Sequence, residues 1–532
     1  MAFKKKSTTE KEVFALTLPL RHEPWQRDVL DKLFRCCNQC KNALISRKLK
    51  AWKQLSQTRQ WRYFQNKLNE LYNVLNKIDK DTHPKEHKTQ MDKIRAVCKS
   101  RNDLLKDAGF TMYAFEHDIG PIYKHFGKSI NVSVAQKIAD NVWESFESVI
   151  FKSGKEVSFS SIADFRYLEA KSNASGFVYD SGFLYLGGKV RYRMKLPVCL
   201  NRCDTYGYEE QALQRNVHFC GIERRPYPDG WHYFAVLHLG GTPPMKVKKE
   251  TGELLHSLGH GRVGHDIGTQ TLASVGDNDA CLVVLAEQTQ SIEDELRRIN
   301  RAMERSRRST NPDMFNEKGI VPITRLPYEC VINVRGTPRR KWTKSKRYKA
   351  LEHKRLALYA RQEECRKRQH NELANKLLAF GDEHYIEKMN FAALSKKNKN
   401  SENSKSKCRK RFGKSISNKA PAVFVNILEK KVVSQGGTFQ RIDTFNAKAS
   451  QYNHQEKAYK KKHLGQRWNH MPDGHKIQRD LYSAFCIQNT NSTFDGFKQD
   501  LLETKYSRFL ELHESAIEAA KIKQYIPSSM GI

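Results

Sequence analysis

The stretch Arg262-Val263-Gly264-His265-Asp266-Ile267-Gly268 lies near the middle of the chain, and Thr269-Gln270-Thr271-Leu272-Ala273 follows it directly. Both segments are rich in strand-forming residues, and a glycine stands on each side of the aspartate. This pattern predicts a β-hairpin with the carboxylate of Asp266 at its edge. The alternative is that Asp266 is an ordinary turn aspartate, so it has to be judged together with the rest of the chain.

Two further acidic residues have comparable surroundings. Glu387 follows the apolar-flanked run Glu383-His384-Tyr385-Ile386, and a glutamate in a buried strand needs either a partner or a metal ion. Asp480 opens an amphipathic helix, where the helix dipole alone would favour an acid. No acid is decisive alone. The ordered set of Asp266, Glu387 and Asp480 predicts carboxylates that converge on two divalent ions for phosphodiester hydrolysis.

The charge balance indicates the kind of partner. The 532 residues include 94 Lys and Arg against 58 Asp and Glu, which gives a net charge of +36. Such an excess attracts polyphosphates and releases their counterions, so nucleic acid is the expected partner. A membrane surface is disfavoured, because neither an amphipathic anchor nor a lipidation signal accompanies the charge. The basic start of the sequence lacks the apolar region of a secretory signal.

Twelve cysteines occur, mostly isolated. Cys37-Asn38-Gln39-Cys40 is a CxxC sequence within a helical pattern, and no second pair lies at zinc spacing. We interpret it as part of a packed helix. This cysteine usage fits a reducing compartment, and we expect a cytoplasmic location.

The chain is long enough for several domains. A strand is predicted at 12–20, helices from 24 to 150, and short alternating strands from 151 to 245, which suggest a small barrel or sandwich completed by the N-terminal strand. One of the helices is predicted to start with Ser133 as its cap. Two long charged helices follow at 290–310 and 345–380, then a basic stretch at 396–414, a helix at 420–434 and a strand at 438–442.

The three acid-bearing segments resemble the split RuvC nuclease domain of transposon-encoded TnpB proteins and type V CRISPR effectors. Gly264-His265-Asp266-Ile267-Gly268 is similar to the first motif of that family, with His265 in place of the usual aliphatic residue. Glu387-Lys388-Met389-Asn390 is similar to the second. Arg479-Asp480-Leu481-Tyr482-Ser483-Ala484 is similar to the third, although Asn-Ala-Ala is commoner there than Tyr-Ser-Ala. The resemblance covers residues 255 to about 490, including the arginine-rich helix near 301–308 and Lys419-Ala420-Pro421.

The resemblance implies a multidomain α+β fold with a helical recognition lobe, a β-barrel-like wedge domain and an RNase H-like (RuvC) α/β nuclease domain split in sequence. The implied boundaries are a wedge strand at 1–22, the helical recognition lobe at 23–150 and the β-rich wedge domain at 151–250. The RuvC domain follows at 251–445, with motifs I and II and a helical insertion at 290–380. A zinc-free segment that binds the target nucleic acid takes 446–478, and motif III with the C-terminal helices takes 479–532.

The implied function is that of an RNA-guided DNA endonuclease. Asp266, Glu387 and Asp480 would hold two Mg²⁺ ions, for which Mn²⁺ can substitute, and the protein would bind a guide RNA and a double-stranded DNA target beside a short flanking motif. Expected nucleic-acid contacts are Arg301, Arg305, Arg308, Lys407, Arg409, Lys410 and Arg411. Two alternatives stay open: a non-cleaving RNA-guided DNA-binding protein and a basic RNA-binding scaffold. The sequence also leaves open the choice between the TnpB and CRISPR branches, the form of the guide and the oligomeric state.

Proteins of this family often carry two zinc-binding CxxC pairs between the second and third motifs. The corresponding segment here, 446–478, contains no cysteine. Its histidines, His454, His463, His470 and His475, lack the tight pair spacing of a structural zinc site. We therefore expect no zinc, and we expect this segment to contact DNA near the acids.

Overall fold

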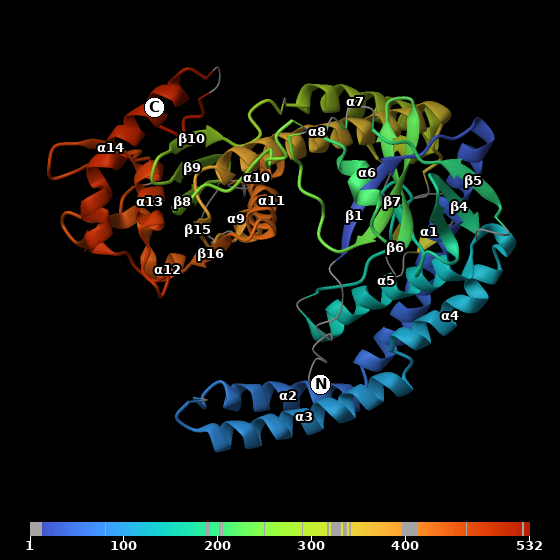
Figure 1. Cartoon of the computed structure of the whole chain (residues 1–532). Helices are drawn as coiled ribbons and strands as arrows, with labels where there is room; N and C mark the ends of the chain where they lie inside the picture. Colours follow the sequence, from blue (N-terminus) through green and yellow to red (C-terminus); the bar gives the residue numbers. More distant parts are fainter. Residues whose placement is uncertain are drawn as a thin grey trace. The chain divides into compact units, whose positions relative to one another are not determined.

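A computed structural model describes residues 13–79, 81–152, 154–187, 192–201, 204, 206–248, 250–289, 291–316, 319–320, 331–332, 338–339, 342–395, 412–463, 465–523 and 526–532. The chain forms two compact units (Figure 1). Unit 1 comprises Met1–Met245 and Met303–Leu356, and unit 2 comprises Lys246–Ala302 and Ala357–Ile532. Within the described ranges, no helix is both long and apolar enough to cross a membrane.

Most helices of unit 1 begin with a capping residue, and α3 (Pro84–Asp107) begins with a proline in its first turn. The other long helices are α1 (Pro24–Ser56), α2 (Arg59–Leu75), α4 (Met112–Lys124) and α5 (Val132–Phe151). Glu23 and Gln26 form a capping box before α1, and Thr58 caps α2. The cap of α5 is Asn131, whose side chain accepts from the backbone N–H of Ser133. Ser133 was therefore wrongly predicted as the cap, because its hydroxyl instead accepts from the backbone of Lys171.

Helices α2 and α3 form an antiparallel pair with a small core of its own, and Figure 1 shows the two side by side. Leu68 of α2 packs with Ile94 and Cys98 of α3. Helix α2 buries one face and exposes the other, and its aromatic residues lie on both. Trp61 is buried in the main core, whereas Tyr63 is largely exposed. The pair thus presents aromatic and basic side chains to solvent.

The β structure of unit 1 consists of two sheets. Strands β1 (Val13–Pro19), β7 (Gly230–Gly240), β6 (Val217–Tyr227) and β2 (Tyr167–Glu169) form an antiparallel sheet in that order. Strands β3 (Gly176–Asp180), β4 (Phe183–Gly187) and β5 (Met194–Pro197) form the second sheet. The predicted pairing of the N-terminal strand is confirmed. In the described part of the chain, however, the strands form two separate sheets and not one continuous barrel. A bridge between Leu20 and Val198 links the two sheets.

Unit 2 is built on a mixed five-stranded sheet with the order β10-β9-β8-β15-β16. Strands β8 (Arg262–Ile267), β9 (Thr271–Val275) and β10 (Ala280–Val284) are antiparallel neighbours. Strand β15 (Glu383–Glu387) runs parallel to β8, and β16 (Thr438–Ile442) runs parallel to β15. The hairpin predicted around Gly268 is therefore confirmed as β8 and β9.

Helices cover both faces of this sheet. On one face, Ile267, Leu272 and Ile386 pack with α8 (Lys346–Leu378) and α11 (Pro421–Ser434). On the other, Ala273, Val275 and Tyr385 pack with α13 (Arg479–Gln488) and α14 (Gln499–Lys521). The predicted charged helices are α7 (Glu293–Thr310) and α8. The division between the units falls inside both of them, at Ala302/Met303 and Leu356/Ala357, whereas the sequence placed 290–380 within one nuclease domain.

The remaining described elements are short. They are α6 (Tyr208–Leu213), α9 (Phe391–Leu394), α10 (Gly413–Lys419), α12 (Thr444–Ala447), the 3₁₀ turns η1 (Gly127–Ser129), η2 (Pro312–Met314) and η4 (Ala449–Gln451), and the two-stranded ladders β11 (Phe315–Asn316) with β12 (Gly319–Ile320), β13 (Val331–Ile332) with β14 (Pro338–Arg339), β17 (Tyr452–Asn453) with β18 (Ala458–Tyr459), and β19 (Trp468–His470) with β20 (Lys476–Gln478).

Candidate functional site

Strand alternation places two of the predicted acids on one face of the unit 2 sheet. Successive side chains of a strand point to opposite faces. In β8, Ile267 belongs to the core with α8 and α11, so Asp266 lies on the opposite, α13 face. In β15, Tyr385 packs in the α13 core, and Glu387, two residues later, shares its face.

The parallel pairing of β8 and β15 aligns these two acids. The last paired positions are His265 and Ile386. Asp266 and Glu387 each follow directly, so they stand beside each other at the carboxyl ends of two neighbouring parallel strands. Crevices outside the carboxyl ends of strands are the usual binding positions of sheets with parallel strands.

Helix α13 brings the third acid to the same face. Asp480 is in its first turn, and Gln478 caps the helix by accepting from the backbone N–H of Leu481 at 2.8 Å. Gly264 explains how closely the helix approaches β8: a Cβ at this position would collide with the backbone of Ala484 and Gln488. A glycine two residues before Asp266 thus allows α13 to lie directly on the strand.

The electrostatics of Asp266 show that the three carboxylates influence one another. Burial raises the pKa of Asp266 well above its usual value, and the negative charges of Asp480 and Glu387 raise it further. The positive charge of Arg479 and a hydrogen bond with Ser483 lower this pKa in part. Acids on a second strand and on a helix therefore act on Asp266 through their charges, and the joint role of the three acids stays a prediction.

The other two acids have their own partners. Burial raises the pKa of Glu387 to about 7, although a hydrogen bond with the backbone of Ala449 opposes the shift. Asp480 is ion-paired with Arg479, with 3.2 Å between Nη2 and Oδ1, and its side chain is only 15% exposed. Sequence reasoning missed Arg479, Ser483 and Ala449. Only the first two lie in a motif, and nothing local to Ala449 marks it.

The donor set suits a divalent cation. Carboxylate oxygens are hard ligands of the kind that Mg²⁺ prefers, and a cation would relieve the mutual repulsion that raises the pKa of Asp266. The side chains do not yet surround a common point, because in the described ranges no group of three or more His, Cys, Asp or Glu is arranged to hold a metal ion. Metal binding by Asp266, Glu387 and Asp480 is therefore a proposal that requires the three carboxylates to draw together.

A buried chain of hydrogen bonds lies on the opposite face of the same strands. His265 and His384 are fully buried, with 2.9 Å between His265 Nε2 and His384 Nδ1. His265 Nδ1 lies 2.8 Å from Ser274 Oγ, and His384 Nε2 lies 3.0 Å from the carbonyl oxygen of Gly381. Burial lowers the pKa of both histidines, that of His384 to about 4, so both rings are neutral.

The predicted basic contacts are only partly described. Arg301, Arg305 and Arg308 lie on α7 with exposed side chains at a spacing of four and three residues, which puts them on one helix face. Arg308 also pairs with Glu304 at 3.1 Å. The other predicted contacts lie outside the described residues: Lys407, Arg409, Lys410 and Arg411.

The histidines of the cysteine-free segment have different surroundings. His454 is buried, with Nδ1 2.7 Å from the hydroxyl of Tyr482. His475 pairs with Asp473 at 3.1 Å, His463 accepts from the backbone of Gly465, and His470 is exposed on β19. The expectation of a zinc-free segment remains a prediction for metal analysis.

The sequence matches no protein-family model and no curated protein. Two solved complexes align with most of the chain. A Cas12f1–sgRNA–target DNA complex is 14% identical over 90% of this chain and 99% of its own, with a TM-score of 0.38. A CRISPR-Cas12f ternary complex is 12% identical over the same shares, with a TM-score of 0.22. TM-scores this low do not establish a common fold.

Proposed function

We propose that the protein is an RNA-guided DNA endonuclease whose single active site consists of Asp266, Glu387 and Asp480. The observation that carries the proposal is the convergence of these acids at the carboxyl ends of β8 and β15 and the start of α13, where the charges of Asp480 and Glu387 act on Asp266. The mixed sheet carries one acid on β8, its first strand in sequence, and another on β15, its fourth strand in sequence. This arrangement supports an RNase H-like nuclease domain.

The residues around the acids would prepare them for metal binding. Bound Mg²⁺, or Mn²⁺ in its place, would activate water and stabilise the leaving 3′ oxygen, which leaves 5′-phosphate ends. The ion pair with Arg479 orients Asp480, and the positive charge of Arg479 also acts on Asp266. Since the pKa of Glu387 is about 7, this residue is partly protonated at neutral pH and has to lose its proton when a cation binds.

The charge of the chain supports nucleic acids as partners. A net charge of +36 favours association with polyphosphate backbones, and the exposed face of α7 adds three arginines to that field. We propose a guide RNA that pairs with one strand of a double-stranded DNA target, while the protein reads a short flanking duplex. A cytoplasmic location belongs to this proposal.

The proposal can be tested by sequencing RNA that copurifies with the protein and by incubating that complex with labelled target DNA and Mg²⁺. We expect scission by the wild type and a loss of about a thousandfold or more in rate for Glu387→Gln, with DNA binding retained. Glu383→Gln is the matched control, because Glu383 lies on the same strand but is half exposed and bonded to Tyr385. Cleavage by Glu387→Gln at the wild-type rate would refute the site. DNA binding without scission by the wild type would favour a non-cleaving protein.

A further inference from the structure

A short turn at the carboxyl end of β16, residues 443–449, carries a largely exposed aromatic ring. Helix α12 lies within this turn, and the side chain of Phe445 in it is 79% exposed. In the described part of the chain, no other phenylalanine is exposed to this extent. Single exposed apolar residues are common on protein surfaces, so the place of this ring in the fold decides whether it has a role.

The start of the turn lies beside one of the candidate acids. Strands β15 and β16 run parallel, and Glu387 is paired with Ile442 at the end of both. The turn begins with the next residue, at the edge of the sheet where Glu387 lies. Its Thr444 donates from the hydroxyl to the carbonyl of Lys388 at 3.2 Å, which holds the turn against the end of β15.

The other end of the turn is held at the same place. The backbone of Ala449 is hydrogen-bonded to Glu387, and Ala447 and Ala449 are fully buried in the core that includes α13. Phe445 precedes Ala449 by four residues, which span at most about 14 Å even when fully extended. The ring is therefore within reach of the nucleotide whose phosphate the acids would hold, or of the one beside it.

The turn is ordered without any ligand. The carboxylate of Asp443 accepts from the backbone N–H of Phe445 at 2.9 Å and from the side-chain amide of Asn446 at 2.7 Å. Lys448, which ends α12, has a φ of 45°, a left-handed conformation that side chains other than glycine rarely adopt. Such a conformation persists only where the surrounding structure fixes the backbone, so the ring is held in a defined place.

Lys448 also leaves one face of the ring open. Its Nζ lies over the ring of Phe445, 5.5 Å from the ring centre. Since most of the Phe445 side chain is exposed, the opposite face is accessible to a second planar group. A cation on one face and a nucleobase on the other both interact favourably with an aromatic ring, and stacking tolerates any base.

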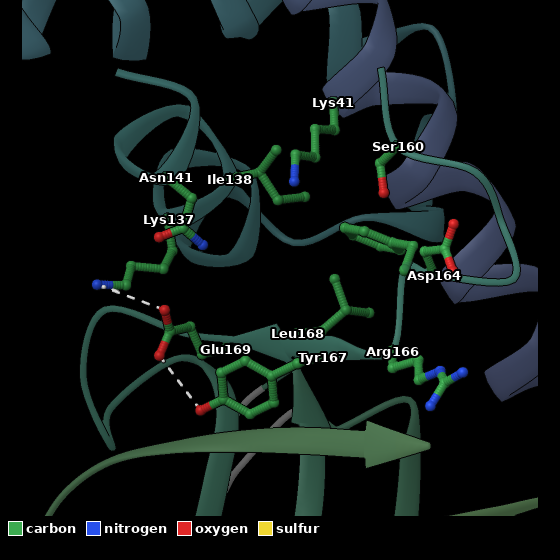
Figure 2. Close-up of a pocket in the computed structure, with 11 residues that line it drawn as sticks. Lys41, Lys137, Ile138, Asn141, Ser160, Asp164, Arg166, Tyr167, Leu168 and Glu169 are labelled. Atoms are coloured by element: carbon green, nitrogen blue, oxygen red, sulfur yellow. Dashed lines mark hydrogen bonds and ion pairs between the residues drawn. The ribbon is translucent and has the colours of Figure 1, made fainter. Parts of the chain in front are cut away.

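A cavity of unit 1 that is also lined by aromatic residues offers no comparable ring (Figure 2). Tyr167 in its wall donates to Glu169 at 3.2 Å, and Glu169 also pairs with Lys137 at 3.5 Å. Phe165, the other aromatic residue of the lining, is buried. Both of these rings belong to the wall, whereas Phe445 is free to contact a ligand.

We propose that Phe445 stacks on one unpaired nucleobase of the strand that the acids cleave, and thereby determines which phosphate reaches them. A base inside a duplex is covered on both faces by its neighbours, so only a base out of the stack can contact the ring. Phe445 is thus a positioning residue. The inference rests on the proposed function for the identity of the strand and for its cleavage, whereas the stacking can be measured without cleavage.

The first test measures stacking in the full-length protein in EDTA, where a metal-dependent nuclease does not cut. Phe445→Trp places a fluorescent ring at this position, and the wild-type spectrum is subtracted because the chain contains seven tryptophans. Single-stranded DNA should quench most of the added emission, because a stacked base quenches an indole. A strand of the same length in which every nucleotide is abasic should not, although it carries the same phosphates.

Ile522→Trp is the matched control for this test. Ile522 is 84% exposed in the same unit, and its neighbour Lys523 pairs with Glu287 directly after β10, at the opposite edge of the sheet from β16. Its emission should change little with either strand. Quenching of Phe445→Trp by both strands equally, or by neither, would overturn the proposal.

The second test measures position and rate of the cut in the complex with guide RNA and Mg²⁺. Phe445→Leu should slow cleavage about tenfold and spread the cut over neighbouring phosphates, as expected for the loss of one stacked base. Its affinity for the target should stay near that of the wild type, because pairing with the guide holds the DNA. Phe445→Tyr keeps the ring and should cut like the wild type.

An abasic nucleotide in the target identifies the base that the ring contacts. Placed beside the cut, it should slow the wild type about as much as Phe445→Leu does, and it should slow that variant no further. Equal rates for Phe445→Leu and the wild type would overturn the assignment. If the wild type does not cleave while Phe445→Trp is quenched only by the strand with bases, the nuclease proposal fails and the stacking site stands.

Discussion

Two strands of the molecule bury a charge, and they treat it in opposite ways. In unit 1, the guanidinium of Arg224 on β6 is 2% exposed, donates to the carbonyls of Ile162 and Phe165, and faces Asp31 at 3.9 Å. It also lies 4.2 Å from the ring centre of Trp231. In unit 2, the carboxylate of Asp266 on β8 has two like charges as neighbours, which the positive charge of Arg479 offsets only in part. A fully compensated buried charge supports the fold, whereas a partly compensated one is available to bind a cation.

The sharpest way to break this comparison is to remove the compensated charge. Arg224→Met should lower the free energy of unfolding of unit 1 by about 3–5 kcal/mol, because Asp31 and two carbonyls lose their partner. Arg225→Met is the control: its side chain is 37% exposed and pairs with Glu223, so a loss of about 1 kcal/mol or less is expected. Urea unfolding followed by hydrogen exchange in β6 and β7 measures both. Equal losses would show that the burial of Arg224 contributes nothing special.

The second prediction concerns the approach of α13 to β8. Gly264→Ala places a Cβ against the backbone of Ala484 and Gln488, neither of which can move alone, and should cost about 2–4 kcal/mol. Gly120→Ala in α4 meets no other backbone, but Pro121 follows it and opposes the gain in helix propensity, so a change of about 1 kcal/mol or less is expected. Thermal unfolding of the two variants compares the magnitudes. A neutral Gly264→Ala would mean that α13 does not rest on the strand.

Unit 2 also contains a buried titratable group that stays neutral. His370 on α8 is fully buried, donates from Nε2 to the carbonyl of Lys419 at 2.9 Å, and has its pKa lowered to about 4 by burial. Below pH 6.5 this histidine binds a proton in the unfolded chain but stays neutral in the folded state. The free energy of unfolding therefore falls as the pH drops from about 6.5 to about 4. The loss at pH 5 should be about 2 kcal/mol. His370→Gln keeps an N–H donor and should remove that part of the pH dependence in urea titrations at pH 7 and 5.

The smallest expected effect has the opposite sign. Asp266→Asn removes a repelling charge and should stabilise unit 2 by about 1 kcal/mol in EDTA, because binding sites trade stability for function. Mg²⁺ should raise the melting temperature of the wild type but not that of the variant. Asp277→Asn is the control, since Asp277 pairs with Lys505 at 2.5 Å and its loss should destabilise. If Asp266→Asn lowers the melting temperature in EDTA, Asp266 is a structural acid.

Local sequence patterns predicted single strands and helices, whereas contacts between distant segments could not be predicted from them. The hairpin that carries Asp266, the strand that ends at Glu387 and the helix that opens with Asp480 follow from local patterns, and all three are confirmed. Strand order and long-range contacts have no local signal. The partners of Arg224, Asp31 among them, come from separate segments, and Ala449 reaches Glu387 only because the chain folds back.

The barrel was the weaker prediction for the same reason. Short alternating runs predict strands but not which strand pairs with which, and closure depends on the register between strands. The described strands of unit 1 form two sheets linked at Leu20 and Val198. The cap of α5 shows the local limit: Asn131 and Ser133 both suit a cap, and the hydroxyl of Ser133 was needed elsewhere.

The histidine pair beneath the acids has a consequence for how this sequence can change. The carbonyl of Gly381 can only accept, so His384 donates to it and must accept from His265, which in turn accepts from Ser274. Each proton in this series of hydrogen bonds therefore has a single position. Replacing either histidine by an aliphatic residue would leave a buried nitrogen of the other without a partner, while replacing both leaves only the two ends, the hydroxyl of Ser274 and the carbonyl of Gly381, to find other partners. Positions 265 and 384 should then vary together among descendants of this sequence, even though neither touches a substrate.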